Sequence, residues 1–424
     1  MSGNLSARDA ECLWHPYTQH AIDREALPVV RAHGAVLELE DGRELIDAIS
    51  SWWTCLHGHG HPRLAAALQD QVERLDHVLF AGTTHEPAVR LAEELLDVAP
   101  PGLARVFYSD NGSTAVEVAL KMSYHAWVHA GAPERTTFVA LEHGYHGDTF
   151  GAMSVGDPDP FFLPYAPLLF DVERIPPTEE ALERIFREKG SQIGALLIEP
   201  LVQGAAGMVM HPPSFVAAAR RVCDEHGVHL IVDEVMTGFG RTGTLFACEQ
   251  AGITPDLLCI AKGITGGMIP LAATLATEAI FEAFLNDERS RFFPHGHTWT
   301  ANPIGCAVAL ASLEVCRRTN VPARLAAIGT RIEGALREEG LHEDPRVSDM
   351  RRTGGIVALD LVPPPGDQAG YLASVAPMLR AAAIERGALL RPLGNVLYAL
   401  PPASTTDEEC DRIAEVMGEL VRLL

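Results

Sequence analysis

Short apolar runs alternate with helical patterns through the middle of the chain. The apolar runs are residues 105–108, 137–141, 193–198, 229–232, 257–261 and 272–276. Their hydrophobicity is continuous rather than alternating, which is typical of strands that are covered on both faces. Between them, residues 114–127, 178–188 and 214–225 have helical patterns, and a Ser or Thr cap is expected at the start of the first and the last. The pattern predicts an α/β domain with a mainly parallel sheet, spanning roughly residues 51–310.

A different pattern follows this region. Residues 304–318 and 321–339 predict two long helices, and residues 355–361 predict a strand. Near the start, residues 35–46 form a strand-turn-strand pattern around Asp41-Gly42, a strong hairpin signal. We therefore expect a smaller α+β domain made of residues 311–424, with residues 1–50 joined to it. Without repeats or disordered linkers, the two domains should pack around a shared cleft.

Two polar residues come directly at the ends of apolar runs. Asp233 ends the run that begins at residue 229, and Lys262 follows the run 257–261. A lysine can bond covalently to the aldehyde of pyridoxal phosphate, and an aspartate can pair with its pyridinium nitrogen. Taken alone, each residue is more often a strand end in solvent. The pair together predicts a pyridoxal-phosphate site.

The segment 110–114 lies between a predicted strand and a predicted helix. Gly112 lets backbone amides approach a ligand closely, and Ser113 and Thr114 add hydroxyls at the start of the helix. A simple capped turn is the alternative, but a phosphate site is favoured beside the candidate lysine. Tyr145 and Val235 could cover the two faces of the cofactor ring.

Glu199 closes the run 193–198, and its role stays open. It could hold polar groups of the cofactor or a neighbouring donor. It could equally be a plain strand stop before Pro200.

Composition excludes some classes of function. The net charge is −23, from 33 Lys and Arg against 56 Asp and Glu, and no basic stripe is present, which argues against nucleic-acid binding. The eight cysteines have no C-x-x-C spacing and predict a reducing compartment, with the cytoplasm as the default. No targeting segment or apolar stretch long enough to span a membrane is expected.

Two motifs resemble other kinds of site. Residues 238–243 match G-x-G-x-x-G, but no helical pattern follows directly and no acidic residue stands about 20 positions later, so NAD binding is not expected. His57, His59 and His61 alternate with glycines, as do residues 295–297, and neither run has zincin spacing or a supporting Cys or carboxylate set. No metal site is expected.

Read in order, seven segments closely resemble the class III aminotransferases of the fold-type I pyridoxal-phosphate family. They are DNGS at 110–113, GYHG at 144–147, IEP at 198–200, DEV at 233–235, GRTG at 240–243, KG at 262–263 and GHTWTANP at 296–303. The resemblance implies a covalent bond from Lys262 to pyridoxal 5′-phosphate, Asp233 at the pyridine nitrogen, Gly112 and Ser113 at the phosphate, and Tyr145 on the ring. It also implies a homodimer with composite sites, in which Thr298 reaches the phosphate of the partner's cofactor.

Three further segments are similar to one branch of this family, which acts in biotin biosynthesis. They are LWHPYTQ at 13–19, SSWW at 50–53 with the following His57-Gly58, and RPLGNVLY at 391–398. The resemblance implies conversion of 8-amino-7-oxononanoate to 7,8-diaminononanoate. It implies further that Arg391 binds the far carboxylate, and that Tyr17, Trp52 and Trp53 wall the substrate chain.

Two departures from the family pattern bear on the substrates. Tyr398 stands where many class III members have an Arg that grips the donor's α-carboxylate, so that clamp is absent, and Tyr398 is itself expected to be a substrate-binding residue. His297 and Trp299 flank Thr298 and leave the amino donor open between S-adenosylmethionine and lysine. The alternative within the family is an ω-aminotransferase for diamines or ω-amino acids. A cofactor-binding protein without turnover is a further alternative, which the combination of Lys262, Asp233 and Tyr145 disfavours.

Overall fold

A seven-stranded sheet forms the centre of the larger lobe. The structure is a computed structural model that describes residues 4–22, 26–364 and 366–424. The strand order is β4 (Leu103–Ser109), β12 (Ala272–Thr277), β11 (Leu257–Ile260), β10 (His229–Asp233), β7 (Ile193–Ile198), β5 (Thr137–Leu141) and β6 (Val172–Ile175). Strands β11, β10, β7, β5 and β6 are parallel, whereas β12 is antiparallel to β11 and to β4. The predicted α/β fold with a mainly parallel sheet is confirmed.

Both faces of this sheet are covered, which explains the continuous apolar runs. In β7, Ala195 and Leu197 pack into the core around α5 (Gly112–His129), whereas Leu196 and Ile198 pack into the core on the other face.

The other helices of this lobe are α3 (Pro62–Val72), α4 (Glu86–Val98), α6 (Phe150–Val155), α7 (Glu179–Lys189), α8 (Pro213–His226), α9 (Glu278–Glu282) and α10 (Pro303–Thr319). Among the described residues, the 3-10 turns of this lobe are η1 (Leu163–Leu168), η2 (Ala247–Ala251), η3 (Lys262–Thr265) and η4 (Arg289–Arg291), and η5 (Leu341–Glu343) follows α11 (Val321–Glu338) in the other lobe.

The expected Ser and Thr caps are wrong for both helices. Helix α5 begins earlier than expected and is capped by Asn111, whose side chain accepts from the Thr114 amide at 3.0 Å while the Asn111 amide donates to the Thr114 hydroxyl at 3.2 Å. Helix α8 begins at Pro213 after Pro212, without a side-chain cap. Proline suits this first position because its missing N–H would have no helical partner.

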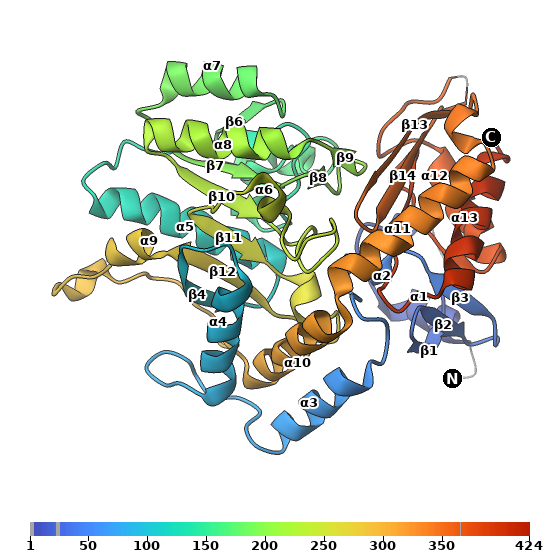
Figure 1. Ribbon diagram of the computed structural model, residues 1–424, viewed down its shortest axis with the longest axis horizontal. Coiled ribbons are helices and arrows are strands. Elements are labelled where there is room, and N and C mark those ends of the chain that lie inside the picture. Colours follow the sequence, from blue (N-terminus) through green and yellow to red (C-terminus); the bar gives the residue numbers. More distant parts are fainter. Residues whose placement is uncertain (1–3, 23–25, 365) are drawn as a thin grey trace.

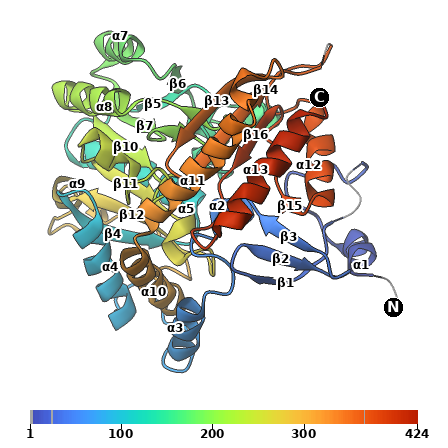
Figure 2. The same ribbon diagram turned by 45° about the vertical axis from the view of Figure 1, so that its right-hand side comes forward.

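The smaller lobe combines both ends of the chain. One sheet has the order β1 (Val29–His33), β2 (Val36–Leu39), β3 (Glu44–Asp47) and β15 (Ala388–Leu389), and the other has the order β13 (Val347–Thr353), β14 (Ile356–Leu361) and β16 (Val396–Ala399). The remaining helices are α1 (Leu5–Cys12), the short turn α2 (Ser50–Trp53), α11 (Val321–Glu338), α12 (Val375–Glu385) and α13 (Asp407–Val421). Figure 2 shows β3 beside β15, with α12 and α13 next to them. We propose the two-domain division that the sequence pattern predicts, with α2 and α10 running across its boundaries at residues 50 and 310. Residues 1–3 lie outside the described part.

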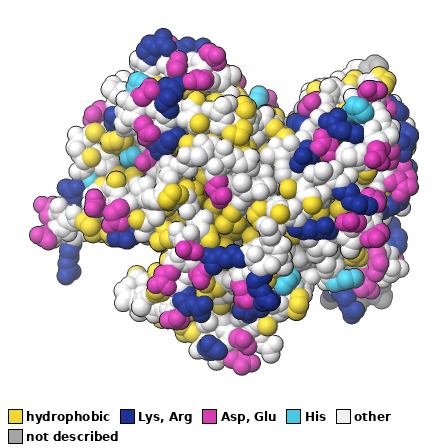
Figure 3. All heavy atoms as spheres, viewed as in Figure 1, with side chains coloured by type: hydrophobic (Ala, Val, Ile, Leu, Met, Phe, Trp, Pro, Cys, Tyr) yellow, Lys and Arg dark blue, Asp and Glu magenta, His cyan; other side chains and the backbone are white. Residues whose placement is uncertain are grey.

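Helices α10 and α11 lead from the larger lobe to the smaller one (Figure 1). The two lobes are separated by a notch on one side of the molecule, and acidic and basic side chains are mixed on the face shown (Figure 3). The hairpin of β8 (Val202–Gln203) and β9 (Val209–Met210) meets the small lobe, where Arg351 donates to the carbonyls of Gly207 and Met208 at 2.6 and 2.8 Å. Among the described helices, none has the length and apolar character that crossing a membrane requires.

Candidate active site

A cavity of about 650 Å³ lies at the carboxyl ends of β10 and β11 and at the start of α5. Asp233 is the last residue of β10, and Lys262 comes two residues after the end of β11. Because β10 and β11 are parallel neighbours, with Asp233 opposite Cys259, both polar residues reach the same edge of the sheet. The cavity is lined by the predicted residues Gly112, Ser113, Tyr145, Asp233, Val235 and Lys262, together with Trp53.

Lys262 lies against an aromatic ring in this cavity. Its backbone has φ of 45°, and its ammonium lies 4.6 Å from the centre of the Trp53 ring. Burial lowers the pKa of Lys262 from 10.5 to about 8, while the carboxylates of Asp233 and Glu199 act in the opposite direction. An amine with such a pKa is available in its neutral, nucleophilic form near neutral pH.

The carboxylate of Asp233 is oriented by a histidine that the sequence interpretation missed. His146 donates from Nδ1 to Asp233 Oδ2 at 2.7 Å, and the Val235 amide donates to Oδ1 at 3.0 Å. The other ring nitrogen of His146 is buried and has no hydrogen-bond partner among the described residues. Each carboxylate oxygen can accept a further donor, as a protonated pyridine nitrogen would require. The position of His146, directly after Tyr145, was the available signal.

The start of α5 is shaped to bring backbone amides to a ligand. Among the hydrogen bonds of the described residues, none engages the amides of Gly112 and Ser113 at the N-terminus of this 18-residue helix. A Cβ on Gly112 would lie 2.6 Å from Val235 Cγ1, so only glycine permits this close packing. Free amides at a helix N-terminus fit a phosphate group.

The two hydroxyls of this segment have different surroundings. Ser113 Oγ accepts from the Thr149 amide at 3.0 Å and lies 2.7 Å from Thr149 Oγ1. Thr114 Oγ1 accepts from the Asn111 amide in the capping box, and its single O–H lies 2.8 Å from the Asn111 carbonyl and 3.1 Å from Asp110 Oδ1. The expectation that Thr114 offers a free hydroxyl is therefore wrong, whereas Ser113 lines the cavity.

Glu199 supports the turn that carries Tyr145. Its carboxylate accepts from the amides of Tyr145 at 3.1 Å and Gly204 at 3.0 Å. Burial raises the pKa of Glu199 to about 7, with the nearby Asp233 charge adding to the effect. Two hypotheses for Glu199 were left open by the sequence, and the one in which it only ends the strand before Pro200 does not account for these contacts.

Tyrosines from distant parts of the chain meet at the edge of the cavity. The hydroxyls of Tyr17 and Tyr145 lie 3.2 Å apart, and both donate to Asp148 Oδ1, at 2.6 and 3.1 Å. Burial raises the pKa of both phenols far above the ordinary value, so they remain donors. The ring of Phe161 packs edge-on against both tyrosines. The sequence interpretation missed Asp148 and Phe161.

The two tryptophans occupy a left-handed turn. The φ angles of Ser50, Ser51, Trp52 and Trp53 are 50°, 44°, 66° and 76°. This conformation costs an L-residue about 1–2 kcal/mol. Trp53 donates from Nε1 to the hydroxyl of the fully buried Tyr398 at 3.0 Å. Tyr398 therefore acts on the cavity through Trp53 and does not line it.

Arg391 lies over the other tryptophan. Its guanidinium carbon is 4.5 Å from the centre of the Trp52 ring, and Nη2 donates to the Tyr371 hydroxyl at 3.3 Å. No acidic side chain forms an ion pair with Arg391 among the described residues. A stacked guanidinium with free donors is suited to a carboxylate ligand. Tyr371 was missed because it lies 20 residues before Arg391 in a loop without a recognisable pattern.

Thr298 is the predicted residue that the structure leaves apart. It is exposed and does not line the cavity, and its neighbour Trp299 packs against His77 with ring centres 4.6 Å apart. In a single chain, no hydrogen bond joins Thr298 to the other predicted residues among those described. Its role depends on a second subunit and stays a prediction.

The histidine run 57–61 has polar neighbours that the sequence interpretation denied. Asp47, Cys55 and His59 offer ligand atoms within 4.8 Å of one another. However, Asp47 and Cys55 contact opposite nitrogens of His59, at 2.8 Å from Nε2 and 3.6 Å from Nδ1. Because Asp47 and Cys55 lie on opposite sides of the imidazole ring, one ion cannot bind all three side chains in this arrangement. We therefore interpret the cluster as a chain of hydrogen bonds and not as a metal site.

The run 238–243 forms turns around the buried Arg241. Arg241 donates to the carbonyls of Pro401 at 3.1 Å and Trp53 at 3.2 Å. The glycines of residues 238–243 lie in a loop between the lobes, and no helix begins within this run.

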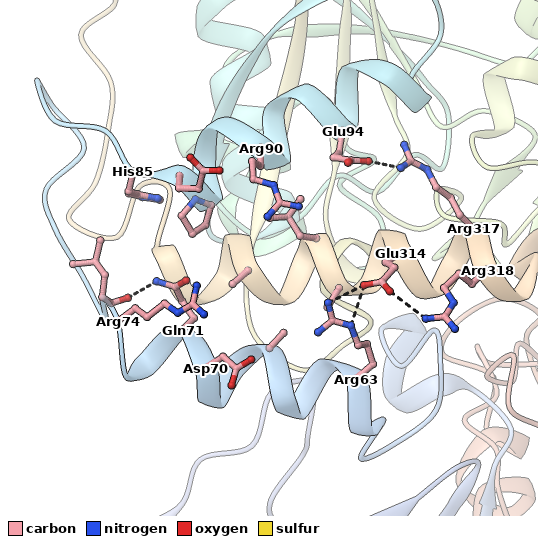
Figure 4. Close-up of a pocket in the computed structure, with 17 residues that line it drawn as sticks. Arg63, Asp70, Gln71, Arg74, His85, Arg90, Glu94, Glu314, Arg317 and Arg318 are labelled. Carbon is pink, nitrogen blue, oxygen red and sulfur yellow. Dashed lines mark hydrogen bonds and ion pairs between the residues drawn. The ribbon is translucent and has the colours of Figure 1, made fainter.

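A second cavity, of about 640 Å³, lies between α3, α4 and α10 (Figure 4). Arg63 and Arg318 pair with Glu314 there, and Arg317 pairs with Glu94. None of the predicted site residues lines it. Its mixed, mutually paired charges distinguish it from the cavity that contains Lys262.

Comparison with known proteins identifies the family. Residues 17–421 match the family model of aminotransferase class III. The chain belongs to the class III aminotransferases. It is therefore a pyridoxal-phosphate-dependent transaminase, and the free amides, the carboxylate and the lysine described above fit that cofactor.

Relatives agree over nearly the whole chain. Adenosylmethionine-8-amino-7-oxononanoate aminotransferase from Synechococcus elongatus is 48% identical, over 96% of this chain and 98% of its own. The protein of the same name from Mycobacterium leprae is 40% identical, over 99% of this chain and 97% of its own.

Solved structures agree in the same way. The enzyme of this name from Methanocaldococcus jannaschii superposes with a TM-score of 0.94 at 35% identity, covering 99% of this chain and 98% of that one. A PLP-bound amine transaminase from an uncultivated Pseudomonas species has a TM-score of 0.91 at 32% identity, covering 97% and 98%.

Proposed function

We propose that this chain converts 8-amino-7-oxononanoate to 7,8-diaminononanoate in biotin biosynthesis, with S-adenosylmethionine or lysine as the amino donor. The observation that carries the proposal is Arg391, which is stacked on Trp52 and has no acidic partner among the described residues, while the adjacent Trp53 contacts Lys262. The names of the relatives support the same substrate. A long substrate whose carboxylate lies far from its reacting carbon would extend from Lys262 to Arg391.

We further propose the roles of the residues at the reacting end. Lys262 Nζ takes the proton from the donor's α-carbon and later returns a proton to the product, since an amine with a pKa of about 8 exchanges protons readily near neutral pH. When bound, pyridoxal phosphate supplies an electron sink for the charge left on that carbon. Asp233, held by His146, keeps a proton on the pyridine nitrogen because an opposite charge raises the proton affinity of a neighbouring base.

The test is a donor screen with purified holoenzyme. We expect 7,8-diaminononanoate, detected by mass spectrometry, with S-adenosylmethionine or lysine as donor, and parallel double-reciprocal plots as a ping-pong reaction requires. Lys262→Ala should abolish turnover. Faster turnover with diamines or ω-amino acids than with 8-amino-7-oxononanoate would instead establish the alternative ω-aminotransferase, which the amine transaminase relative makes the second candidate.

We also propose a cytoplasmic homodimer in which Thr298 reaches the partner's cofactor phosphate. The exposure of Thr298 away from the cavity of its own chain supports this arrangement. A dimer by light scattering is expected, with activity lost on dilution into monomers. Activity that persists in a monomer would contradict composite sites.

A further inference from the structure

The turn that carries Trp52 and Trp53, residues 50–53, is here called the tryptophan turn. Resting on the proposed function, we propose that Asp47 and His59 are positioning residues, whose ion pair holds the tryptophan turn in its left-handed form and thereby sets both indole rings for the substrate. Four consecutive non-glycine residues with positive φ do not keep that shape by themselves. Contacts from outside the turn must hold it.

Asp47 supplies most of these contacts. Its carboxylate is fully buried and accepts from the Ser51 amide at 2.9 Å, the Ile49 amide at 3.3 Å and the Ser51 hydroxyl at 2.8 Å. Asp47 is the last residue of β3, which pairs with β2 on one side and β15 on the other. The carboxylate therefore connects the turn to a rigid sheet.

His59 completes the support. Its Nε2 donates to Asp47 Oδ2 at 2.8 Å, and its backbone exchanges two hydrogen bonds with Gly34, at 2.7 and 3.1 Å. The hydrogen bond to Asp47 is the main reason that the pKa of His59 rises to about 10, so the ring is a cation near neutral pH. The other ionisable groups facing this pair are Cys55 and Arg241. An imidazolium fixed by its own backbone keeps the carboxylate in one orientation.

The two ends of the tryptophan turn, Ser50 and Trp53, are fixed by other contacts. Ser50 donates from Oγ to the Leu400 carbonyl at 2.8 Å, and Arg241 donates to the Trp53 carbonyl at 3.2 Å. In the middle of the turn, Asp47 holds Ser51 through its amide and its hydroxyl, and Thr54 donates from Oγ1 to the Ser51 carbonyl at 3.2 Å.

The rings on this turn face both functional ends of the site. Trp52 lies 4.5 Å from the Arg391 guanidinium carbon, and Trp53 lies 4.6 Å from Lys262 Nζ. A change in the conformation of the turn would therefore move both rings together: Trp52 beside Arg391 and Trp53 beside Lys262. Substrate binding should be more sensitive to this change than the stability of the fold.

The experiment compares Asp47→Ala, Asp47→Asn, His59→Phe and His59→Gln in the holoenzyme. The matched control is Asp256→Ala, because Asp256 also accepts from a backbone amide, that of Leu230, and from an arginine, Arg220, both at 2.7 Å, but at the opposite end of β11. The measurements are KM and kcat for 8-amino-7-oxononanoate, near-UV circular dichroism of the tryptophans, and the melting temperature.

We expect Asp47→Ala and His59→Phe to raise KM by about tenfold or more, with a smaller change in kcat and an altered near-UV spectrum. Asp47→Asn and His59→Gln should lie closer to the wild type, because each amide can keep part of the hydrogen bonding. Asp256→Ala should lower the melting temperature and leave KM unchanged.

A wild-type KM and near-UV spectrum in Asp47→Ala and His59→Phe would overturn the inference, and so would equal effects from Asp256→Ala. Failure of the proposed function is distinguishable, because the wild-type protein would then show no turnover of 8-amino-7-oxononanoate. In that case the near-UV spectra still decide whether Asp47 and His59 hold the turn.

Discussion

We propose that the cofactor attaches to Lys262, and the lowered pKa of this residue then predicts how pH controls the attachment. Only the neutral amine can attack the aldehyde of pyridoxal phosphate. Burial lowers the pKa of Lys262 from 10.5 to about 8, against the opposing charges of Asp233 and Glu199. Raising the pH from about 6 to about 10 is therefore the perturbation, and the attachment rate of the apoprotein should rise and then level off above about pH 8.

The size of the effect follows from the two pKa values. At about pH 7.5, a pKa of about 8 leaves roughly a quarter of the amines neutral, whereas the ordinary value of 10.5 leaves roughly one in a thousand. At this pH, Lys262 should therefore react about 200 times faster than its ordinary pKa would allow, before any gain from binding.

The assay is stopped-flow absorbance of apoprotein mixed with pyridoxal phosphate across this pH range, with a blocked lysine as the reference amine. Glu199→Gln is the matched variant: it keeps the shape of the side chain but removes a charge that raises the pKa of Lys262, so the inflection should move to lower pH. Since the pKa of Glu199 is about 7, its carboxylate is charged over the upper part of the range. A rate that keeps climbing in parallel with the reference amine up to about pH 10 would refute the reasoning.

Three further predictions concern other parts of the site. Gly112→Ala should weaken cofactor affinity about 10- to 100-fold in equilibrium dialysis, since the new Cβ would lie 2.6 Å from Val235 Cγ1. The control is Gly334→Ala on α11, where the new Cβ meets open space. This control should leave cofactor affinity unchanged and stabilise the fold by at most about 1 kcal/mol. Asp233→Asn should keep the cofactor on the lysine but slow the single-turnover donor half-reaction by about 100-fold or more; an unchanged rate would contradict its role. Arg391→Lys should raise KM for 8-amino-7-oxononanoate about tenfold, because a point charge replaces a stacked fork, and equal losses in both half-reactions would count against carboxylate binding.

Local sequence patterns were sufficient for the sheet and for the two residues at its edge. Continuous apolar runs predict strands covered on both faces, and the alternate packing of Ala195 and Leu196 on opposite faces of β7 is the physical reason. Asp233 and Lys262 were found because a polar residue at the end of a buried parallel strand must lie at the carboxyl edge of the sheet. These inferences need only the residue and its neighbours along the chain.

Contacts between distant segments could not be predicted in this way. The antiparallel direction of β12, the packing of Tyr371 and Trp52 around Arg391, and the contact of His146 with Asp233 depend on how separate elements pack. Helix α5 begins before Thr114, so its cap is Asn111, whose side chain accepts from the Thr114 amide.

The sequence by itself determined the fold class and the positions of Asp233 and Lys262 at strand ends, because strand periodicity and strand-end residues are local properties, and its motif segments indicated the family by resemblance. Only the tertiary structure decided that the tryptophan turn is left-handed and that Asp47 and His59 support it. That conformation is unfavourable for each residue alone, and hydrogen bonds that form only after the chain has folded compensate for it.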